Sequence, residues 1–199
     1  MEKITVAVFD FDGTLTRGFP SRLLFLKQLV GIPRFFCTLI RILPYYASQF
    51  FKSNNNPDDP LDKLLLKGWS KNELEFQANI FVTRVLNHMM RPRALERLRF
   101  HQEKGHVCII VSGGFDVYLK ILAKKYNINH LLCSEIEFNS HNLSTGTIHN
   151  GYCLGNQKVL RLQNLLNKRD KYIIYAYGDS SNDKHLLEFA DYGFYRKFE

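Results

Sequence analysis

Three short runs of apolar residues recur along the chain, and each stops abruptly at small and polar residues. They are residues 4–9 (ITVAVF), 107–111 (VCIIV) and 172–177 (YIIYAY). Apolar, β-rich runs of this length are typical of strands buried on both faces of a parallel sheet. In open sheets of this kind, ligands bind at the carboxyl ends of the strands. The polar residues after each run are therefore candidates for a functional site.

Helical periods lie between these runs. Apolar side chains are spaced mostly by three or four positions in three segments. One precedes the second run (Ala94, Leu95, Leu98), one follows it (Leu119, Leu122, Tyr126), and one precedes the third run (Val159, Leu162, Leu165, Leu166). Such spacing places apolar side chains on one side of a helix. Alternation of strand and helix predicts an α/β fold with a parallel sheet.

Residues 17–86 break this alternation. They combine helix-like apolar periods with several Pro and Gly breaks and with the polar loop 53–59 (SNNNPDD). We therefore predict a catalytic core formed by residues 1–16 and 87–199, with residues 17–86 as a helical insertion after the first strand.

Composition narrows the class of protein. The chain has 199 residues, of which 45% are hydrophobic, enough to bury a core in one domain that carries an insertion. The formal net charge of +8 favours an anionic partner, such as a phosphate compound, nucleic acid or a lipid surface.

The cysteines and histidines argue against a structural zinc site. Four widely spaced cysteines form no CxxC pair, and seven histidines form no HxxxH or Cys/His cluster. We interpret the cysteines as reduced, partly buried thiols of an intracellular protein. Residues 1–12 carry acids and lead directly into a strand pattern, unlike a signal peptide. We expect a cytoplasmic protein, with a peripheral position at the inner face of a membrane as the alternative.

Two carboxylates follow the first run, in the sequence Asp10-Phe11-Asp12-Gly13-Thr14. At the end of a strand the backbone turns, so Asp10 and Asp12 can flank one cation or one phosphoryl group. Gly13 allows close approach of the backbone. A solvated loop start is the alternative interpretation, but the buried strand directly before the pair favours function.

Small residues follow the second run, at Ser112-Gly113-Gly114. Free N–H groups at the start of a helix bind anions, and glycines let the backbone close on them. An ordinary turn between strand and helix is the alternative.

The third run is followed by residues 178–183 (GDSSND), in which Asp179 and Asp183 lie one helical turn apart. Oxygen-rich ligand sets suit Mg²⁺. The same residues could cap a helix, and both roles are compatible. Lys158, at the start of the helix before the third run, is a solvated charge unless these motifs meet around it.

Taken together, DFDGTLT, VSGG, a lysine and GDSSND, in that order, resemble the four motifs of the haloacid-dehalogenase-like (HAD) hydrolase superfamily. The likeness extends over the whole chain, and the first and last motifs are the specific ones. The helical insertion is similar to the cap of the phosphoserine-phosphatase-like subgroup, subfamily IB. The resemblance implies a Rossmann-like three-layer α/β/α core and an Mg²⁺-dependent phosphatase.

The resemblance also implies roles for the acids. Asp10 would attack phosphorus and form an aspartyl phosphate. Asp12 would protonate the leaving oxygen and then activate water. Asp10, Asp179 and the backbone carbonyl of Asp12 would hold Mg²⁺. Phe11, Ser112 and Gly113 would bind the phosphoryl oxygens. Lys158 would neutralise charge on the nucleophile and the phosphoryl group. Asn182 and Asp183 would position the metal shell and the lysine.

One position departs from the subgroup. Phosphoserine phosphatases usually carry a glutamate shortly after the first motif that binds the substrate ammonium group, but the matching place here lies near Phe19, and no acid follows until Asp58. The expected substrate is therefore a small phosphorylated metabolite or a phosphorylated lipid head group. An amino-acid phosphatase like the phosphoserine enzymes, or a binding module that kept the fold without catalysis, are the alternatives.

The start of the insertion is basic and aromatic. Residues 13–57 hold six basic residues and no acidic ones. Lys27, Arg34 and Arg41 are seven apart and would share a face of one helix, although Gly31 and Pro33 interrupt it. The segment could pack internally with its charges in water, or residues 17–52 could lie on an anionic membrane. Charges within the window argue against a membrane span, and we expect no nucleic acid partner, since no recognised motif accompanies the charge.

Overall fold

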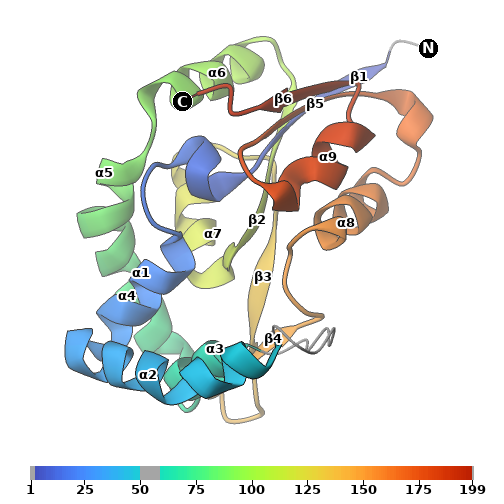
Figure 1. Cartoon of the computed structure of the whole chain (residues 1–199). Coiled ribbons are helices and arrows are strands. Elements are labelled where there is room, and N and C mark those ends of the chain that lie inside the picture. Colours follow the sequence, from blue (N-terminus) through green and yellow to red (C-terminus); the bar gives the residue numbers. More distant parts are fainter. Residues whose placement is uncertain (1–2, 50–58, 199) are drawn as a thin grey trace.

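A six-stranded sheet forms the centre of the protein in a computed structural model, which describes residues 3–49 and 59–198 (Figure 1). The strand order is β4-β3-β2-β1-β5-β6. All neighbouring pairs run parallel except β3 and β4. The strands are β1 (Ile4–Phe9), β2 (Val107–Phe115), β3 (His130–Phe138), β4 (Ser144–His149), β5 (Tyr172–Gly178) and β6 (Tyr192–Tyr195).

The three predicted strands are β2, β1 and β5, which lie side by side in the middle of the sheet. The predicted end of the second strand at residue 111 is wrong, as is the alternative of an ordinary turn at residues 112–114, because β2 continues through them to Phe115. The sheet is also not purely parallel. Only residues 139–143 join β3 to β4, and so short a connection can link antiparallel strands only.

Side chains of the central strands alternate between two apolar layers. Val6 and Val8 pack into one cluster, whereas Ala7 and Phe9 pack into the other. This alternation follows from the two-residue period of a strand. Helices cover both faces and complete the predicted α/β/α layers: α8 (Asn156–Leu166) and α9 (Lys184–Phe189) on the first, and α6 (Pro92–Glu103) and α7 (Asp116–Lys125) on the second.

Helices connect β1 to β2, as predicted for the insertion. They are α1 (Ser21–Val30), α2 (Ile32–Gln49), α3 (Pro60–Leu66), α4 (Lys71–Phe81) and, after the turn Val82–Leu86, α5 (Asn87–Met89). Gly31, with φ of +80°, separates α1 from α2, and the two helices bend by 117°. Lys27 therefore does not share a helix face with Arg34 and Arg41.

The insertion leaves and rejoins the core through a narrow neck. Thr16 and Met90 form an isolated antiparallel bridge. Arg17 N donates to Met89 O at 2.9 Å, and Arg91 N donates to Leu15 O at 2.8 Å. The predicted boundaries at 16/17 and 86/87 lie close to this neck and stay a prediction.

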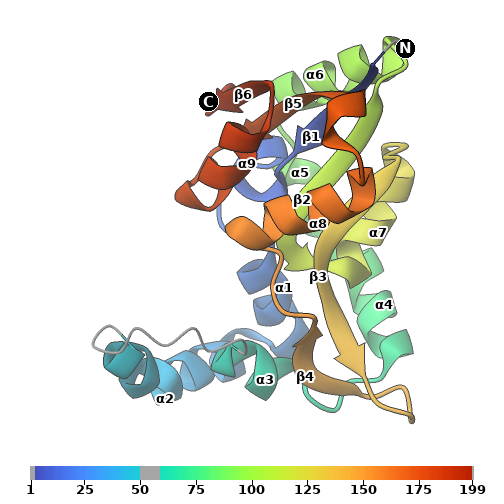
Figure 2. The same ribbon diagram turned by 90° about the vertical axis from the view of Figure 1, so that its right-hand side faces the viewer.

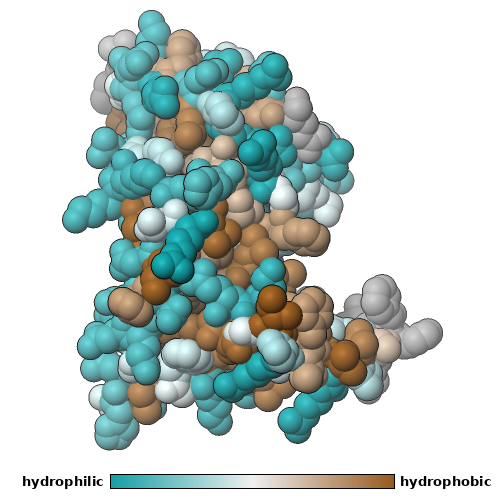
Figure 3. Space-filling model, turned by 90° about the vertical axis from the view of Figure 1, so that its left-hand side faces the viewer, coloured by the Kyte–Doolittle hydropathy of each residue, from teal (hydrophilic) through white to brown (hydrophobic). Residues whose placement is uncertain are grey.

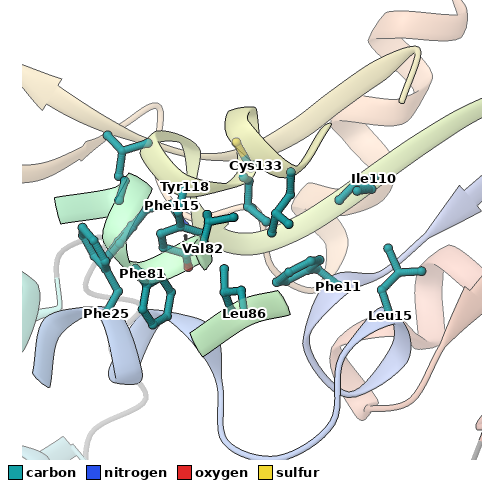
Figure 4. Packing of buried hydrophobic residues seen from close by; sticks show 14 of the residues in the cluster. Phe11, Leu15, Phe25, Phe81, Val82, Leu86, Ile110, Phe115, Tyr118 and Cys133 are labelled. Carbon is teal, nitrogen blue, oxygen red and sulfur yellow. Dashed lines mark hydrogen bonds between the residues drawn. The ribbon is translucent and has the colours of Figure 1, made fainter. Parts of the chain in front are cut away.

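Aromatic packing joins the insertion to the core (Figure 4). Phe25 of α1 and Phe81 of α4 have ring centroids 5.3 Å apart, and each lies 5.3 Å from the ring of Tyr118 on α7. All three side chains are fully buried. Aromatic pairs at such distances stabilise the fold by more than their buried area alone would give. These contacts therefore hold α1 against the core.

A second attachment comes from the β3–β4 hairpin, which reaches down to the insertion (Figure 2). Gly68 N donates to Ser144 O at 2.9 Å, and Ser144 N donates to Trp69 O at 2.8 Å. A Cβ on Gly146 would lie 2.7 Å from Lys63 O. The close approach of β4 to α3 therefore requires glycine at this position. The insertion is thus held at its neck, its aromatic cluster and this hairpin.

Protonation of His101 should destabilise the fold. Its ring is 1% exposed, and its Nε2 lies 2.9 Å from the Tyr177 hydroxyl. Burial, followed by His106 and Arg97, lowers the pKa of His101 from 6.5 to about 4. Between these pH values the unfolded chain binds the proton more readily, so stability falls as pH falls from about 6.5 toward 4.

A glutamine at position 101 does not titrate in this range, so the wild type should lose about 1–3 kcal/mol of its free energy of unfolding relative to His101→Gln as pH falls from about 6.5 to 4. Urea unfolding at several pH values in EDTA measures it. The exposed His88, replaced by Gln, serves as the control and should follow wild type. A difference independent of pH would contradict the assignment.

Candidate active site

The first and last acidic motifs meet at one edge of the sheet. β1 pairs with β5, with Phe9 opposite Tyr177. Asp10 N then donates to Tyr177 O at 2.9 Å. The loop after β5 carries Asp179, so strand pairing brings together residues that are far apart in sequence.

Lys158 connects the two motifs. Its Nζ lies 2.5 Å from Asp10 Oδ1 and 2.6 Å from Asp183 Oδ1. All three side chains are buried. Burial alone would lower the pKa of Lys158, but Asp10 and Asp183 outweigh it and raise that pKa, so the amine stays charged. A functional role for Lys158 was predicted only if the motifs met around it, and the structure brings Asp10 and Asp183 to its amine.

Asp183 holds both the lysine and the last loop. Its Oδ2 accepts hydrogen bonds from Asp179 N at 3.2 Å, Ser180 N at 3.0 Å and Ser180 Oγ at 2.8 Å. With Oδ1 on Lys158, both of its oxygens are engaged, as a positioning residue requires. Asn182 lines the same cleft and is exposed, and its positioning role stays a prediction.

The site carries more negative than positive charge. Burial raises the pKa of Asp10 to about 7, although Lys158 opposes the shift and Asp183 and Asp12 add to it. Burial and Asp183 also raise the pKa of Asp179. The carboxyl groups of Asp10, Asp179 and Asp183 lie around the amine of Lys158, so the ionised carboxylates outnumber its single positive charge.

A divalent cation fits this arrangement. One carboxylate oxygen from each of Asp10, Asp179 and Asp183 lies within 4.8 Å of the others. Thr14 Oγ1 donates to Asp179 Oδ1 at 3.3 Å. A Cβ on Gly13 would lie 2.0 Å from Asp179 Oδ2, so only glycine lets Asp179 lie over the turn. Hard oxygen donors and surplus negative charge suit Mg²⁺. Both oxygens of Asp183 are engaged by Lys158 and the last loop, so Asp179 and the second carboxylate oxygen of Asp10 are the donors that could hold the cation.

Asp12 points away from this cluster, toward the insertion. Its Oδ1 accepts from Ser21 N at 2.8 Å and its Oδ2 from Ser21 Oγ at 2.9 Å. The Ser21 and Tyr118 hydroxyl oxygens are 2.9 Å apart, and the Tyr118 hydroxyl accepts from Phe115 N at 2.9 Å. Because the Ser21 hydroxyl donates its proton to Asp12 Oδ2, the Tyr118 hydroxyl donates to Ser21 Oγ. The predicted cation ligand from Asp12 is its backbone carbonyl. The orientation of the side chain does not test this prediction.

Burial raises the pKa of Asp12 to about 6, against the two hydrogen bonds from Ser21. A carboxyl with such a pKa can hold or release a proton close to neutral pH, as a general acid and base must. Ser21 and Tyr118 were not among the site residues predicted from sequence. The only signal for Ser21 was its position at the start of a helix, because its contact with Tyr118 spans 97 positions.

The predicted phosphate-binding residues lie at the same edge, with different exposures. Ser112 and Gly113 line the cleft, and Ser112 Oγ accepts from Gly114 N at 3.0 Å. The Phe11 side chain is buried in the core, so only its backbone could reach a phosphate (Figure 4). Binding of phosphate by all three residues stays a prediction.

A cleft of about 370 Å³ opens above these groups, between the core and the insertion. Its insertion wall includes Gly18, Pro20 and Arg22. Arg22 Nη1 lies 2.8 Å from Asp62 Oδ1 and 2.9 Å from Asp59 Oδ2. In the sequence Arg22 is one of the six basic residues of 13–57, and only the fold places it at the cleft.

Leu154 covers the cleft from the core side. A Cβ on Gly113 would lie 2.4 Å from Leu154 Cδ2, so the glycine lets this apolar side chain lie against the motif. Phe19, near the place where the subgroup carries its glutamate, is 75% exposed. The cleft is therefore bordered by an arginine and a leucine, without the expected acid among its lining residues.

Comparison with known proteins agrees with this fold. A family model described as haloacid dehalogenase-like hydrolase matches residues 7–188. Protein CicA of Caulobacter vibrioides is 29% identical over 198 residues, which are 99% of this chain and 87% of that protein.

Two solved structures share the fold. A protein of unknown function from Bordetella pertussis Tohama I has a TM-score of 0.77 at 22% identity, over 94% of this chain and 86% of that chain. A probable phosphoserine phosphatase from Vibrio cholerae has a TM-score of 0.69 at 17% identity, over 97% of this chain and 55% of that one.

Mg²⁺ should stabilise the protein through Asp179. Because the cation binds the folded carboxylate cluster, saturating Mg²⁺ at about 100 times its Kd should add about 2.7 kcal/mol to the free energy of unfolding. Asp179→Asn should lose most of this gain. Without Mg²⁺ it should be at least as stable as wild type, since it removes repulsion from Asp183.

Thermal melting with and without Mg²⁺ measures both effects, and Asp170→Asn, at an exposed acid outside the cleft, is the control. An equal Mg²⁺ shift in wild type and Asp179→Asn would exclude Asp179 as a ligand.

Proposed function

Because the chain belongs to the haloacid dehalogenase-like hydrolase family, we propose that it is an Mg²⁺-dependent phosphomonoester hydrolase that works through a phosphorylated Asp10. The family match and the fold shared with phosphoserine phosphatases support phosphatase activity in general. One observation carries the finer proposal. Asp10 is held in a buried cluster with Lys158 and Asp183, while Asp12 is held separately by Ser21.

The first step transfers the phosphoryl group to Asp10. A carboxylate oxygen of Asp10 attacks phosphorus, and the bond between phosphorus and the ester oxygen breaks. Asp12 gives its proton to that oxygen, so an alcohol leaves rather than an alkoxide. Proton transfer needs a carboxyl beside the nucleophile but not bound to the same cation, and the orientation of Asp12 toward Ser21 supports this role.

The second step returns the enzyme to its starting state. Asp12, now ionised, accepts a proton from water, and the water oxygen attacks phosphorus of the aspartyl phosphate. The bond between phosphorus and the Asp10 oxygen breaks, which releases inorganic phosphate and regenerates the carboxylate. The net reaction consumes one water per ester.

Positive charge makes attack by an anion on an anion feasible. Lys158, fixed by Asp10 and Asp183, would offset charge on the nucleophile and the phosphoryl group. Mg²⁺ held by Asp10, Asp179 and the Asp12 carbonyl would supply further Lewis-acid stabilisation. Ser112 Oγ and the N–H groups of Phe11 and Gly113 would bind phosphoryl oxygens.

The cleft favours a substrate without an ammonium group. Its insertion wall carries Arg22, and Asp59 and Asp62 are both paired with that arginine. We propose a small phosphorylated metabolite or a phosphorylated lipid head group as the substrate class. The amino-acid phosphatase activity named for several structural relatives is the alternative.

Loss of either carboxyl of the first motif should remove turnover for different reasons. Asp10→Asn removes the nucleophile and should abolish hydrolysis of an aryl phosphate. Asp12→Asn removes the proton carrier and should lower kcat by about 10²–10⁴-fold. EDTA should stop the wild-type reaction, with recovery on addition of Mg²⁺.

Phosphate release at fixed enzyme concentration measures these effects, with Asp170→Asn as the matched control. Wild-type protein with Mg²⁺ that releases no phosphate from a broad panel of esters would refute the proposal.

Phosphoserine should be a poor substrate relative to 3-phosphoglycerate, which carries a hydroxyl in place of the ammonium group. An ammonium placed in the cleft without a carboxylate partner loses its hydration without compensation. We expect kcat/KM for phosphoserine to be lower by about tenfold, which corresponds to about 1.4 kcal/mol. A preference for phosphoserine would support the amino-acid phosphatase instead.

A further inference from the structure

Helix α2 presents a broad apolar surface that the rest of the described chain leaves uncovered. One side of the helix packs inward through Phe35 and Ile42, which are buried. The neighbouring side exposes large apolar side chains at helical spacing, with exposed fractions of 61%, 52%, 67% and 58% for Ile32, Phe36, Ile40 and Leu43. Positions spaced by three and four lie on one face, so the four residues form one stripe. We call it the α2 face.

The charged side chains of α2 are basic. Arg34 and Arg41, seven positions apart, are both exposed, and at about 100° per residue they lie on the remaining side of the helix, away from the α2 face. The surrounding sequence, residues 13–57, contains six basic residues and no acidic residue. The helix therefore combines an apolar face with a basic face, which suits a partner that is both apolar and negatively charged.

The position of α2 makes its face accessible. Figure 2 shows α2 extending away from the sheet, at the end of the molecule opposite α6. In the space-filling view, brown apolar side chains lie on this projecting part, and the surface is hollowed between it and the core (Figure 3). Exposed apolar surface gathered on one element commonly marks a binding site.

We infer that the α2 face binds the surface of an anionic lipid bilayer, with α2 lying in the plane of the membrane. An interfacial helix buries an apolar side among the acyl chains and keeps basic side chains at the level of the head groups. The α2 face supplies the first feature and Arg34 and Arg41 the second. A bilayer of anionic lipid offers both features, with negatively charged head groups at its surface and apolar acyl chains below them.

Two other arrangements fit less well. Among the described residues, no individual helix has the length and hydropathy to cross a bilayer, and α1 with α2 reaches that threshold only as a pair bent by 117°. Pairing of two α2 faces would bury the apolar stripe but leave Arg34 and Arg41 in water, so it would use only one of the two features of α2.

Binding at this face would bring the insertion, whose residues Gly18, Pro20 and Arg22 line the cleft, to the membrane surface. That consequence rests on the proposed function and would favour a phosphorylated lipid as substrate. The binding itself does not depend on catalysis.

Co-sedimentation with vesicles tests the inference, with full-length Asp10→Asn protein so that no turnover occurs. We expect binding to vesicles of phosphatidylcholine mixed with phosphatidylglycerol and about tenfold weaker binding to pure phosphatidylcholine. Phe36→Ser/Ile40→Ser and Arg34→Glu/Arg41→Glu should each weaken binding to the anionic vesicles by at least about tenfold.

Matched controls come from the same insertion. Phe76→Ser changes an exposed aromatic on α4, and Lys71→Glu/Arg84→Glu reverses two exposed charges outside α2, so both should bind like the parent. Circular dichroism melts verify that each variant is folded. Equal binding by all variants would overturn the inference, as would variants that only convert a dimer to a monomer in analytical ultracentrifugation.

The outcomes separate this inference from the proposed function. In the Asp10-containing background, the α2 variants should hydrolyse a soluble aryl phosphate at the wild-type rate, because none of the changed residues lines the cleft. Vesicle binding by a protein without phosphatase activity would refute the proposed function alone. Phosphatase activity without vesicle binding would refute the α2 inference alone.

Discussion

Buried negative charge around Asp10 is the constraint on which the site depends. Four carboxyl groups come from two loops at the ends of adjacent strands, and Lys158 is the basic side chain bonded to two of them. Charges removed from water are costly unless they are paired. The lysine and the backbone N–H groups on Asp183 each offset part of this cost. Burial raises the pKa values of Asp10 and Asp179, and the carboxylate of Asp183 adds to both shifts. The proposed divalent cation would offset the negative charge that remains.

Two carboxyl groups two residues apart can perform different chemistry because their surroundings differ. Asp10 lies against Lys158, whereas Asp12 is held by Ser21 at the start of α1. A nucleophile must stay ionised, and an acid must hold a proton until the leaving oxygen needs it. Separate environments are the usual means of assigning the two roles. In the proposed mechanism the insertion therefore contributes to catalysis by positioning Asp12, since Ser21 belongs to its first helix.

The insertion also has to satisfy two demands on its surface. Its inner side covers the cleft and packs through Phe25 and Phe81 onto Tyr118. Its outer side, on α2, remains apolar although it lies in the open. A helix needed only as a cover would expose polar side chains there. This contrast is the reason to attribute a binding role to α2.

The sequence by itself determined the central strands, the order of the motifs and the chemistry of each motif. Those features depend on local patterns: an apolar run for a buried strand, and acids or glycines directly after it. It also predicted a helical insertion with a break at Gly31, because glycine and proline act locally. β3 and β4 were missed, since strand pairing with a distant neighbour, rather than local pattern, decides them.

Only the tertiary structure decided which side chains face one another. The contacts of Asp12 with Ser21, of Lys158 with Asp10, and of Arg22 with Asp62 join residues 9, 148 and 40 positions apart. The latter two are not prescribed by local spacing, and they form because strand order and packing bring their elements together. The same holds for α2. Its sequence showed apolar and basic residues, but only the packing of Phe35 and Ile42 revealed which apolar side is covered and which is left to bind a partner.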